Sequence, residues 1–143
     1  MAWRDMTEQE AATRPEARLG GALLWLVLAA VVVCLVAIVG ALLAFDQLRS
    51  IGIRYMIAVG FAGLWSAVFV AMTLLRLPAT PVVASAGFLA WIAWRFAVAL
   101  WSGAGWPLAV DLLAEAALAA GFCGYMADGV RPNAYYRRRL PAA

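Results

Sequence analysis

The sequence predicts an all-α integral membrane protein, a four-helix bundle in which consecutive helices are antiparallel neighbours and both termini are cytoplasmic. Apolar residues make up 66% of its 143 residues and charged residues 13%, against roughly 45–50% and about 25% in soluble proteins. Four apolar runs each approach the roughly 20 residues that a helix needs to cross a membrane. This composition excludes a soluble globular domain, a disordered chain and a coiled coil.

A polar segment of mixed charge, residues 1–18, precedes the first apolar run and is expected to be a short exposed leader. The run that follows it is too long for the hydrophobic region of a signal peptide. Membrane spans are predicted at residues 19–45, 55–75, 82–101 and 107–127. The first span would be about 40 Å long as a helix, so it tilts in a hydrocarbon core of roughly 30 Å or begins in the interface.

The segments between the spans are short. They comprise residues 46–54, 76–80 and 102–106, which makes consecutive helices antiparallel neighbours. Pro107 begins the fourth span, where the missing N–H of proline leaves no helical hydrogen bond unmade. Residues 128–143, with Gly129, Pro132 and Pro141, are expected to end the helical pattern and form a basic cytoplasmic tail.

The distribution of arginines predicts the orientation. Arg49 and Arg54 fall on one side of the membrane and Arg95 falls inside the third span. The side that carries both termini holds eight: Arg4, Arg14, Arg18, Arg76, Arg131, Arg137, Arg138 and Arg139. Because basic residues accumulate on the cytoplasmic side, both termini are placed in the cytoplasm.

Two residue types are missing from the chain, histidine and lysine, and all 11 basic residues are arginine. Their absence excludes histidine-ligated metal or haem, Ser-His and Cys-His catalytic pairs, and a phosphate-binding loop lysine. Cys34 and Cys123 lie far apart in apolar runs and predict neither a disulfide nor a metal site. The net charge of +3 comes from arginines at membrane edges and does not indicate nucleic-acid binding. No catalytic, cofactor or metal site is predicted.

An intramembrane polar set stands out: Arg95, Asp111 and Glu115. Charged groups inside a span are costly and normally pair or line a polar cavity. The short third connector brings the third and fourth helices together as a hairpin. Counted from the hairpin end at 1.5 Å per residue, Arg95 lies about 9 Å deep, Asp111 about 6 Å and Glu115 about 12 Å. The two acids therefore bracket Arg95, and their i, i+4 spacing puts them on one helix face.

Three interpretations of this set stay open. It is a structural clamp that locks the hairpin, a proton, ion or substrate site, or a pair with one further acid facing a partner protein. If Arg95 is committed to Asp111, Glu115 has no obvious partner and holds a proton. Trp91, on the same helix as Arg95, is expected to pack there or to make a cation–π contact.

Three adjacent arginines, Arg137, Arg138 and Arg139, follow the last span. Such a run attracts anionic lipid headgroups. It is interpreted as a topology anchor, or as a contact with lipid or a partner protein.

Three segments carry a family resemblance. They are residues 19–24 (LGGALL), residues 75–78 (LRLP) and residues 125–131 (YMADGVR), the last followed by an aromatic residue at Tyr135 or Tyr136. Together they resemble the domain of unknown function 2569 family of small bacterial inner-membrane proteins. The resemblance implies a four-helix protein of the inner (plasma) membrane with no assigned activity, and it supplies no catalytic residues.

The predicted function is that of a non-enzymatic inner-membrane protein, an accessory or scaffolding subunit of a membrane complex. Its expected partners are membrane lipids and other membrane-protein subunits, including a second copy of itself. It is expected to need no cofactor and to bind no nucleic acid. The alternative is a small proton-coupled transporter or carrier that uses Arg95, Asp111 and Glu115.

Overall fold

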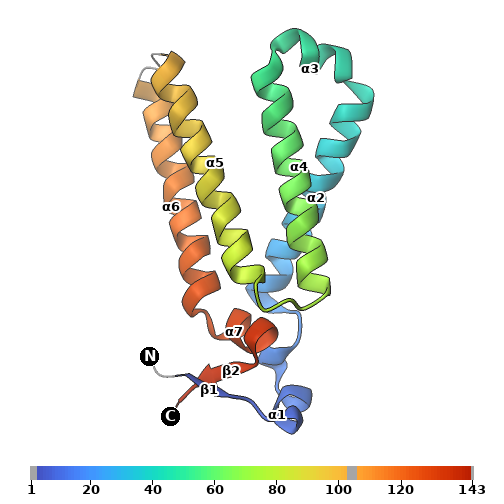
Figure 1. The fold of residues 1–143 in the computed structure, drawn as a ribbon, viewed down its shortest axis with the longest axis vertical. Helices are drawn as coiled ribbons and strands as arrows, with labels where there is room; N and C mark the ends of the chain where they lie inside the picture. The colour runs from blue at the N-terminus through green and yellow to red at the C-terminus, as the bar shows by residue number, and fades with distance from the viewer. Residues whose placement is uncertain (1–2, 103–105, 143) are drawn as a thin grey trace. The chain divides into compact units, whose positions relative to one another are not determined.

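The computed structural model describes residues 3–102 and 106–142 and is mostly helical. Its four long helices are α2 (Gly21–Leu43), α4 (Ile53–Leu74), α5 (Thr80–Ser102) and α6 (Trp106–Asp128). All four are long and apolar enough to cross a membrane (Figure 1). The prediction of a mostly helical, multi-pass membrane protein is confirmed.

The chain divides into two compact units, one of residues Arg18–Leu77 and one of Met1–Ala17 with Pro78–Ala143. In the first unit α2 packs on α4, and in the second α5 packs on α6. Each pair is the antiparallel hairpin that the short connectors predict (Figure 1). The joining of the two hairpins into one four-helix bundle stays a prediction.

The helices of the first unit approach each other closely at Gly63. A Cβ atom added there would lie 2.8 Å from the Cβ of Ala37, a separation that real Cβ atoms do not adopt. Small residues allow such approaches in membranes, where apolar lipid removes the hydrophobic force between helices.

The connector predicted at residues 46–54 is not a plain loop. It contains a helix, α3 (Phe45–Ile51), which contacts both α2 and α4. Phe45 and Leu48, three positions apart on α3, line an apolar hollow between α2 and α4. The helix stops at Gly52, whose φ of +127° favours glycine. The i, i+3 spacing of Phe45 and Leu48 is typical of a helix face, but the segment is too short for this spacing alone to predict a helix.

The other span boundaries shift by a few residues. Helix α2 ends at Leu43, α4 begins at Ile53, α5 begins at Thr80, and α6 extends to Asp128. Residues 103–105 of the connector predicted at 102–106 lie outside the described residues.

The polar ends of the chain fold together. Residues 3–18 are mostly exposed but form regular elements. The expectation that residues 128–143 end the helical pattern is wrong, because they contain helix α7. Strand β1 (Trp3–Asp5), helix α1 (Glu8–Thr13) and the 3-10 turn η1 (Pro15–Ala17) belong with helix α7 (Val130–Arg137) and strand β2 (Arg139–Pro141). We call these five elements the terminal subdomain. β1 pairs antiparallel with β2, with Arg4 opposite Leu140, and η1 packs on α7. Both ends of the chain therefore lie together (Figure 1).

Gly129 turns the chain sharply from α6 into α7 and does not end the helical structure. A Cβ atom at Gly129 would overlap the carbonyl oxygen of Tyr125. The Asn133 side-chain amide donates to the carbonyls of Ala127 and Gly129 at 2.9 and 3.0 Å. The first of these bonds satisfies an oxygen in the last turn of α6. Pro132 is tolerated because it lies in the first turn of α7. Five consecutive residues of α7 are buried: Pro132, Asn133, Ala134, Tyr135 and Tyr136.

Candidate functional site

The α5–α6 hairpin has a defined register. The rings of Phe88 and Phe122 lie 4.6 Å apart between centroids. One turn away, the Cys123 thiol lies 4.0 Å from the Ser85 carbonyl oxygen. In these contacts, a later residue on α6 lies beside an earlier residue on α5, as expected for antiparallel helices. The same register places Arg95 of α5 level with Glu115 of α6.

Arg95 and Glu115 form a two-pronged ion pair. The guanidinium Nε donates to Glu115 Oε2 at 3.1 Å, and Nη2 donates to Oε1 at 2.9 Å. Two parallel charge-assisted hydrogen bonds fix orientation as well as distance. The side chains retain 29% and 31% of their exposure, so the pair is half-buried within the hairpin.

Trp91 completes the cluster. Its indole Nε1 donates to Glu115 Oε2 at 3.2 Å, so the carboxylate receives three hydrogen bonds from two residues of α5. This role was missed in the sequence, where packing or a cation–π contact was expected. The spacing of Trp91 and Arg95 could have predicted it, because residues four positions apart share one face of a helix and can bind the same acid.

Asp111 lies apart from this cluster. Its side chain is exposed, and it makes no hydrogen bond or ion pair with the described residues. It is four residues from Glu115, about 6 Å along the helix, and the guanidinium of Arg95 is already engaged by Glu115. The structure thus brings together two members of the predicted set, Arg95 and Glu115. The arrangement in which Arg95 pairs with Asp111 and leaves Glu115 without a partner is not the one observed.

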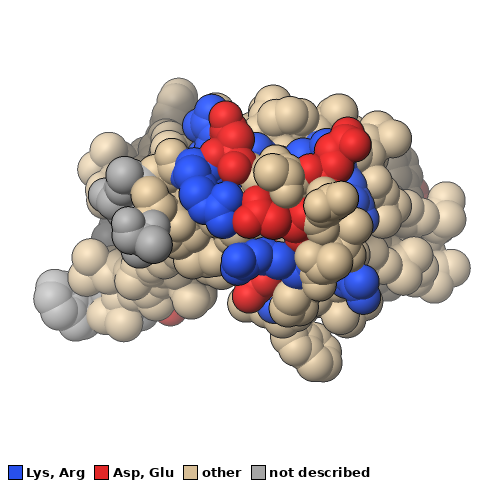
Figure 2. Space-filling view, turned by 90° about the horizontal axis from the view of Figure 1, so that it is seen from below, with Lys and Arg blue, Asp and Glu red and all other residues tan. Residues whose placement is uncertain are grey.

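The terminal subdomain is densely charged, with arginines and acids interleaved on the face seen in Figure 2. Arg4 holds Glu10 through two bonds of 3.0 and 2.7 Å. Arg139 donates to Asp5 at 3.1 Å across the strand pair. Arg131 donates to the Pro15 carbonyl at 3.0 Å. The last two contacts connect N-terminal elements to C-terminal ones, and the Arg4–Glu10 pair stabilises the N-terminal segment itself.

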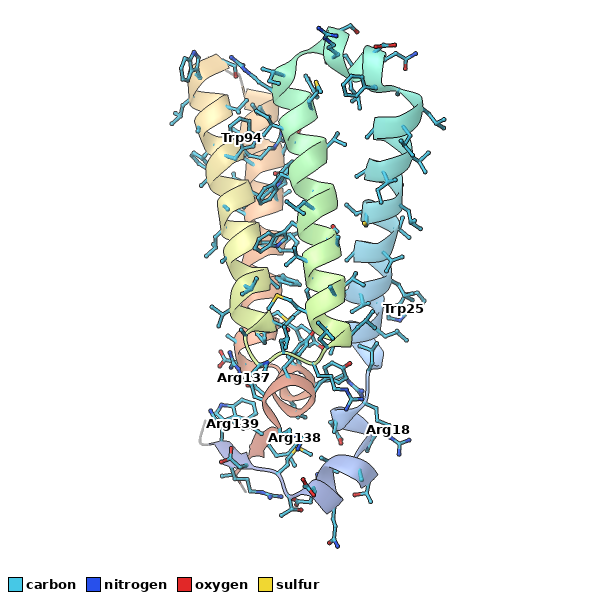
Figure 3. The ribbon with its side chains drawn as sticks, turned by 45° about the vertical axis from the view of Figure 1, so that its right-hand side comes forward. Arg18, Trp25, Trp94, Arg137, Arg138 and Arg139 are labelled. Carbon is cyan, nitrogen blue, oxygen red and sulfur yellow. The ribbon has the colours of Figure 1, made fainter. Side chains whose placement is uncertain are left out.

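The three consecutive arginines have different environments (Figure 3). Arg139 pairs with Asp5. Arg138 is exposed, has a left-handed φ of +52°, and its carbonyl accepts from the Met6 amide at 2.8 Å. Arg137 is half-buried and donates to Asn133 Oδ1 at 3.1 Å. They therefore do not act as one uniform basic patch.

Glu10 provides a pH-dependent element of the terminal subdomain. Its hydrogen bonds with Arg4, and next the Thr7 amide, lower the pKa of its carboxyl from 4.5 to about 2. A depressed acid pKa adds stability above the ordinary value, and this stability is lost as the pH falls from about 4.5 to about 2.

We therefore expect an NMR titration of the Glu10 side-chain carbonyl carbon to show a midpoint near 2. Arg4→Gln removes the largest cause of the shift and should raise the midpoint. Glu8→Gln, which changes another acid of α1, is the matched control and should leave it in place. A wild-type midpoint at the ordinary glutamate value would contradict the ion pair in solution.

Both cysteines are free and half-buried. Within residues 3–102 and 106–142, no group of three or more cysteine, aspartate or glutamate side chains is arranged to hold a metal ion.

Comparisons with known proteins return no relative of this chain. No protein-family model matches it, and neither the curated proteins nor the solved structures contain a match. Any function must therefore be inferred from the chain's own residues, and the Arg95, Glu115 and Trp91 cluster with the nearby Asp111 is the intramembrane feature that bears on it.

Proposed function

We propose that this chain is a non-enzymatic protein of the bacterial inner membrane that acts as an accessory or scaffolding subunit of a membrane complex. The observation that carries the proposal is Asp111, an exposed acid within the apolar helix α6. A charged group inside a span is expensive unless it is paired. A donor from another subunit would supply that pairing.

The neighbouring cluster supports a structural role. Both charges of the Arg95–Glu115 pair are used within one hairpin, and Trp91 adds a third hydrogen bond to the carboxylate. A proton carrier would have to release this acid from three donors during each cycle. The clamp interpretation needs no such step, which favours the scaffold over the carrier.

The proposal includes the orientation with both termini in the cytoplasm, based on the arginine distribution. The pairing of β1 with β2 supports an even number of crossings, since it holds both ends of the chain together. The resemblance to the domain of unknown function 2569 family stays a prediction and agrees with this placement.

Cysteine labelling tests the orientation. In a chain with Cys34 and Cys123 replaced by alanine, Ser102→Cys should react with a membrane-impermeant thiol reagent in intact cells. Ala142→Cys should react only after the cells are opened. Both positions are exposed in the structure, so accessibility within the protein is matched. Labelling of the Ala142→Cys chain alone in intact cells would reverse the orientation.

Purification in a gentle detergent from the native membrane, with the co-purifying proteins quantified, tests the scaffold. We expect at least one membrane protein in near-stoichiometric amount. Asp111→Asn should reduce this partner while membrane abundance stays unchanged. Asp128→Asn is the matched control, because Asp128 is an exposed acid at the far end of the same helix.

Two results would contradict the scaffold. One is the absence of any stoichiometric partner of the wild-type chain. The other is an Asp111→Asn chain that keeps its partner but fails to complement a deletion strain, which would assign Asp111 to transport.

A further inference from the structure

Arg137 is a positioned cation with unused hydrogen-bonding capacity. It ends α7, and one of its five N–H groups is held by Asn133 Oδ1 at 3.1 Å. Asn133 is itself buried and anchored by two carbonyls at the α6–α7 turn. In the part of the chain that the structure describes, Arg137 has no acidic partner, unlike Arg4 and Arg139.

An apolar groove of about 550 Å³ leads away from Arg137 along the α5–α6 hairpin. Small residues lie along it, among them Ala86 on α5 and Ala116 and Ala120 on α6, with Leu89 and Ile92 beside them. Figure 3 shows Arg137 near the base of this hairpin, with Arg138 and Arg139 below it. The groove therefore has one charged end in an otherwise apolar lining.

The length of the groove matches one leaflet of a bilayer. It extends from Pro81 to Ile92 on α5 and from Ala127 to Ala116 on α6, which is about 16 Å of helical rise on each side. Half of a hydrocarbon core of roughly 30 Å is about 15 Å. Arg137, the last residue of α7 in the terminal subdomain, lines the same groove as Pro81 and Ala127, where a lipid headgroup would lie.

We propose that this groove binds one acyl chain of an anionic phospholipid and that Arg137 holds its phosphate. Charge complementarity selects this occupant, because an arginine fork matches a phosphate geometrically and the apolar walls suit a hydrocarbon chain. A helix of a second copy could cover the groove but would bring no anion to Arg137 by that contact alone. The inference depends on the membrane location of the hairpin and not on the scaffold role.

The test is native mass spectrometry of the purified full chain in an uncharged detergent, with bound lipid counted at increasing lipid concentration. Phosphatidylglycerol is compared with diacylglycerol of identical acyl chains, which lacks the phosphate that Arg137 would hold. We expect one phosphatidylglycerol per chain to bind at least about tenfold more tightly, as a charge-assisted hydrogen bond implies. Arg137→Gln should abolish this preference, and Arg138→Gln, at an exposed neighbour, should preserve it.

A second pair of variants probes the groove without touching Asn133 or Arg137. Ala120→Leu fills the groove and should reduce binding of both lipids at least about tenfold. Ala117→Leu changes an exposed alanine of the same helix that does not line the groove, and it should have no effect. This pair keeps the proposal testable even if Arg137→Gln disturbs the terminal subdomain.

Several outcomes would overturn the proposal. Equal binding of the two lipids by the wild-type chain would contradict an anion site at Arg137. A loss of preference in Arg138→Gln as large as that in Arg137→Gln would contradict it as well. Displacement of phosphatidylglycerol by excess inorganic phosphate would assign Arg137 to a soluble anion. A dimer that Ala120→Leu disrupts, without any change in bound lipid, would assign the groove to a second copy.

Discussion

Arg95→Ala is expected to lower the free energy of unfolding of the α5–α6 hairpin by roughly 1–3 kcal/mol. The substitution leaves Glu115 with only the indole donor of Trp91. Removing one partner of a buried pair costs about 3–5 kcal/mol in soluble proteins, whereas polar contacts between membrane helices average about 0.6 kcal/mol. A half-buried pair should fall between these limits.

Thermal unfolding in detergent, arranged as a double-mutant cycle, is the measurement. Arg95→Ala and Glu115→Ala should each destabilise the protein, and the double variant should lose less than the two together. Asp111→Ala is the control, because Asp111 is an exposed acid on α6, the helix that carries Glu115. This substitution should lower the stability of the isolated protein only slightly. An Arg95→Ala chain as stable as the parent would show that the pair does not hold the hairpin.

The pairing also changes what Glu115→Gln should do. A Glu115 without a partner would tolerate the amide. Because the carboxylate instead accepts from Arg95 through both oxygens, the amide nitrogen would face a guanidinium donor. We therefore expect Glu115→Gln to be destabilising as well, so lost activity in that variant would not by itself indicate proton transport.

Gly63→Leu is the second substitution with a large expected effect, and it should destabilise the α2–α4 hairpin by about 1–3 kcal/mol. The new Cβ atom would sit 2.8 Å from the Ala37 Cβ. Because that atom is attached directly to the α2 backbone, relief requires the helices to move apart.

Gly60→Leu is the matched control for this substitution. It lies on the same helix, and nothing is found within 4 Å of a Cβ atom built there. Both changes raise helix propensity by a similar amount, so the difference in thermal stability isolates the contact with Ala37. Equal stability of the two variants would show that α2 and α4 do not approach at Gly63.

The membrane spans were predictable because long runs of apolar residues are enough to identify them. Each hairpin also followed from sequence, since a connector of a few residues leaves no other neighbour. The choice of acid for Arg95 was not predictable to the same degree. Asp111 and Glu115 differ by one helical turn, about 5.4 Å, and depth counted from assumed helix ends carries an error of that size. The register came from packing contacts such as Phe88 with Phe122.

The terminal subdomain was missed for a different reason. Residues 1–18 are locally polar and suggest exposure, and Gly129 with Pro132 suggests the end of helical structure. Their actual structure depends on contacts between distant parts of the chain, such as the Arg131 bond to Pro15, which are 116 residues apart. No local pattern encodes the pairing of β1 with β2. The buried Asn133 that organises the α6–α7 turn was similarly unremarkable in the sequence.

The β1–β2 pair imposes an order on biosynthesis. Asp5 and Arg139, which bond across the strands, are separated by 134 residues. At about 5–20 residues per second, β1 waits roughly 7–27 s for its partner strand to be synthesised. Until then, the first strand exposes an unpaired edge of the kind that pairs with other chains. Closure of the ribbon therefore requires synthesis to pass β2, and a chain that stops before β2 keeps that open edge available to chaperones and proteases.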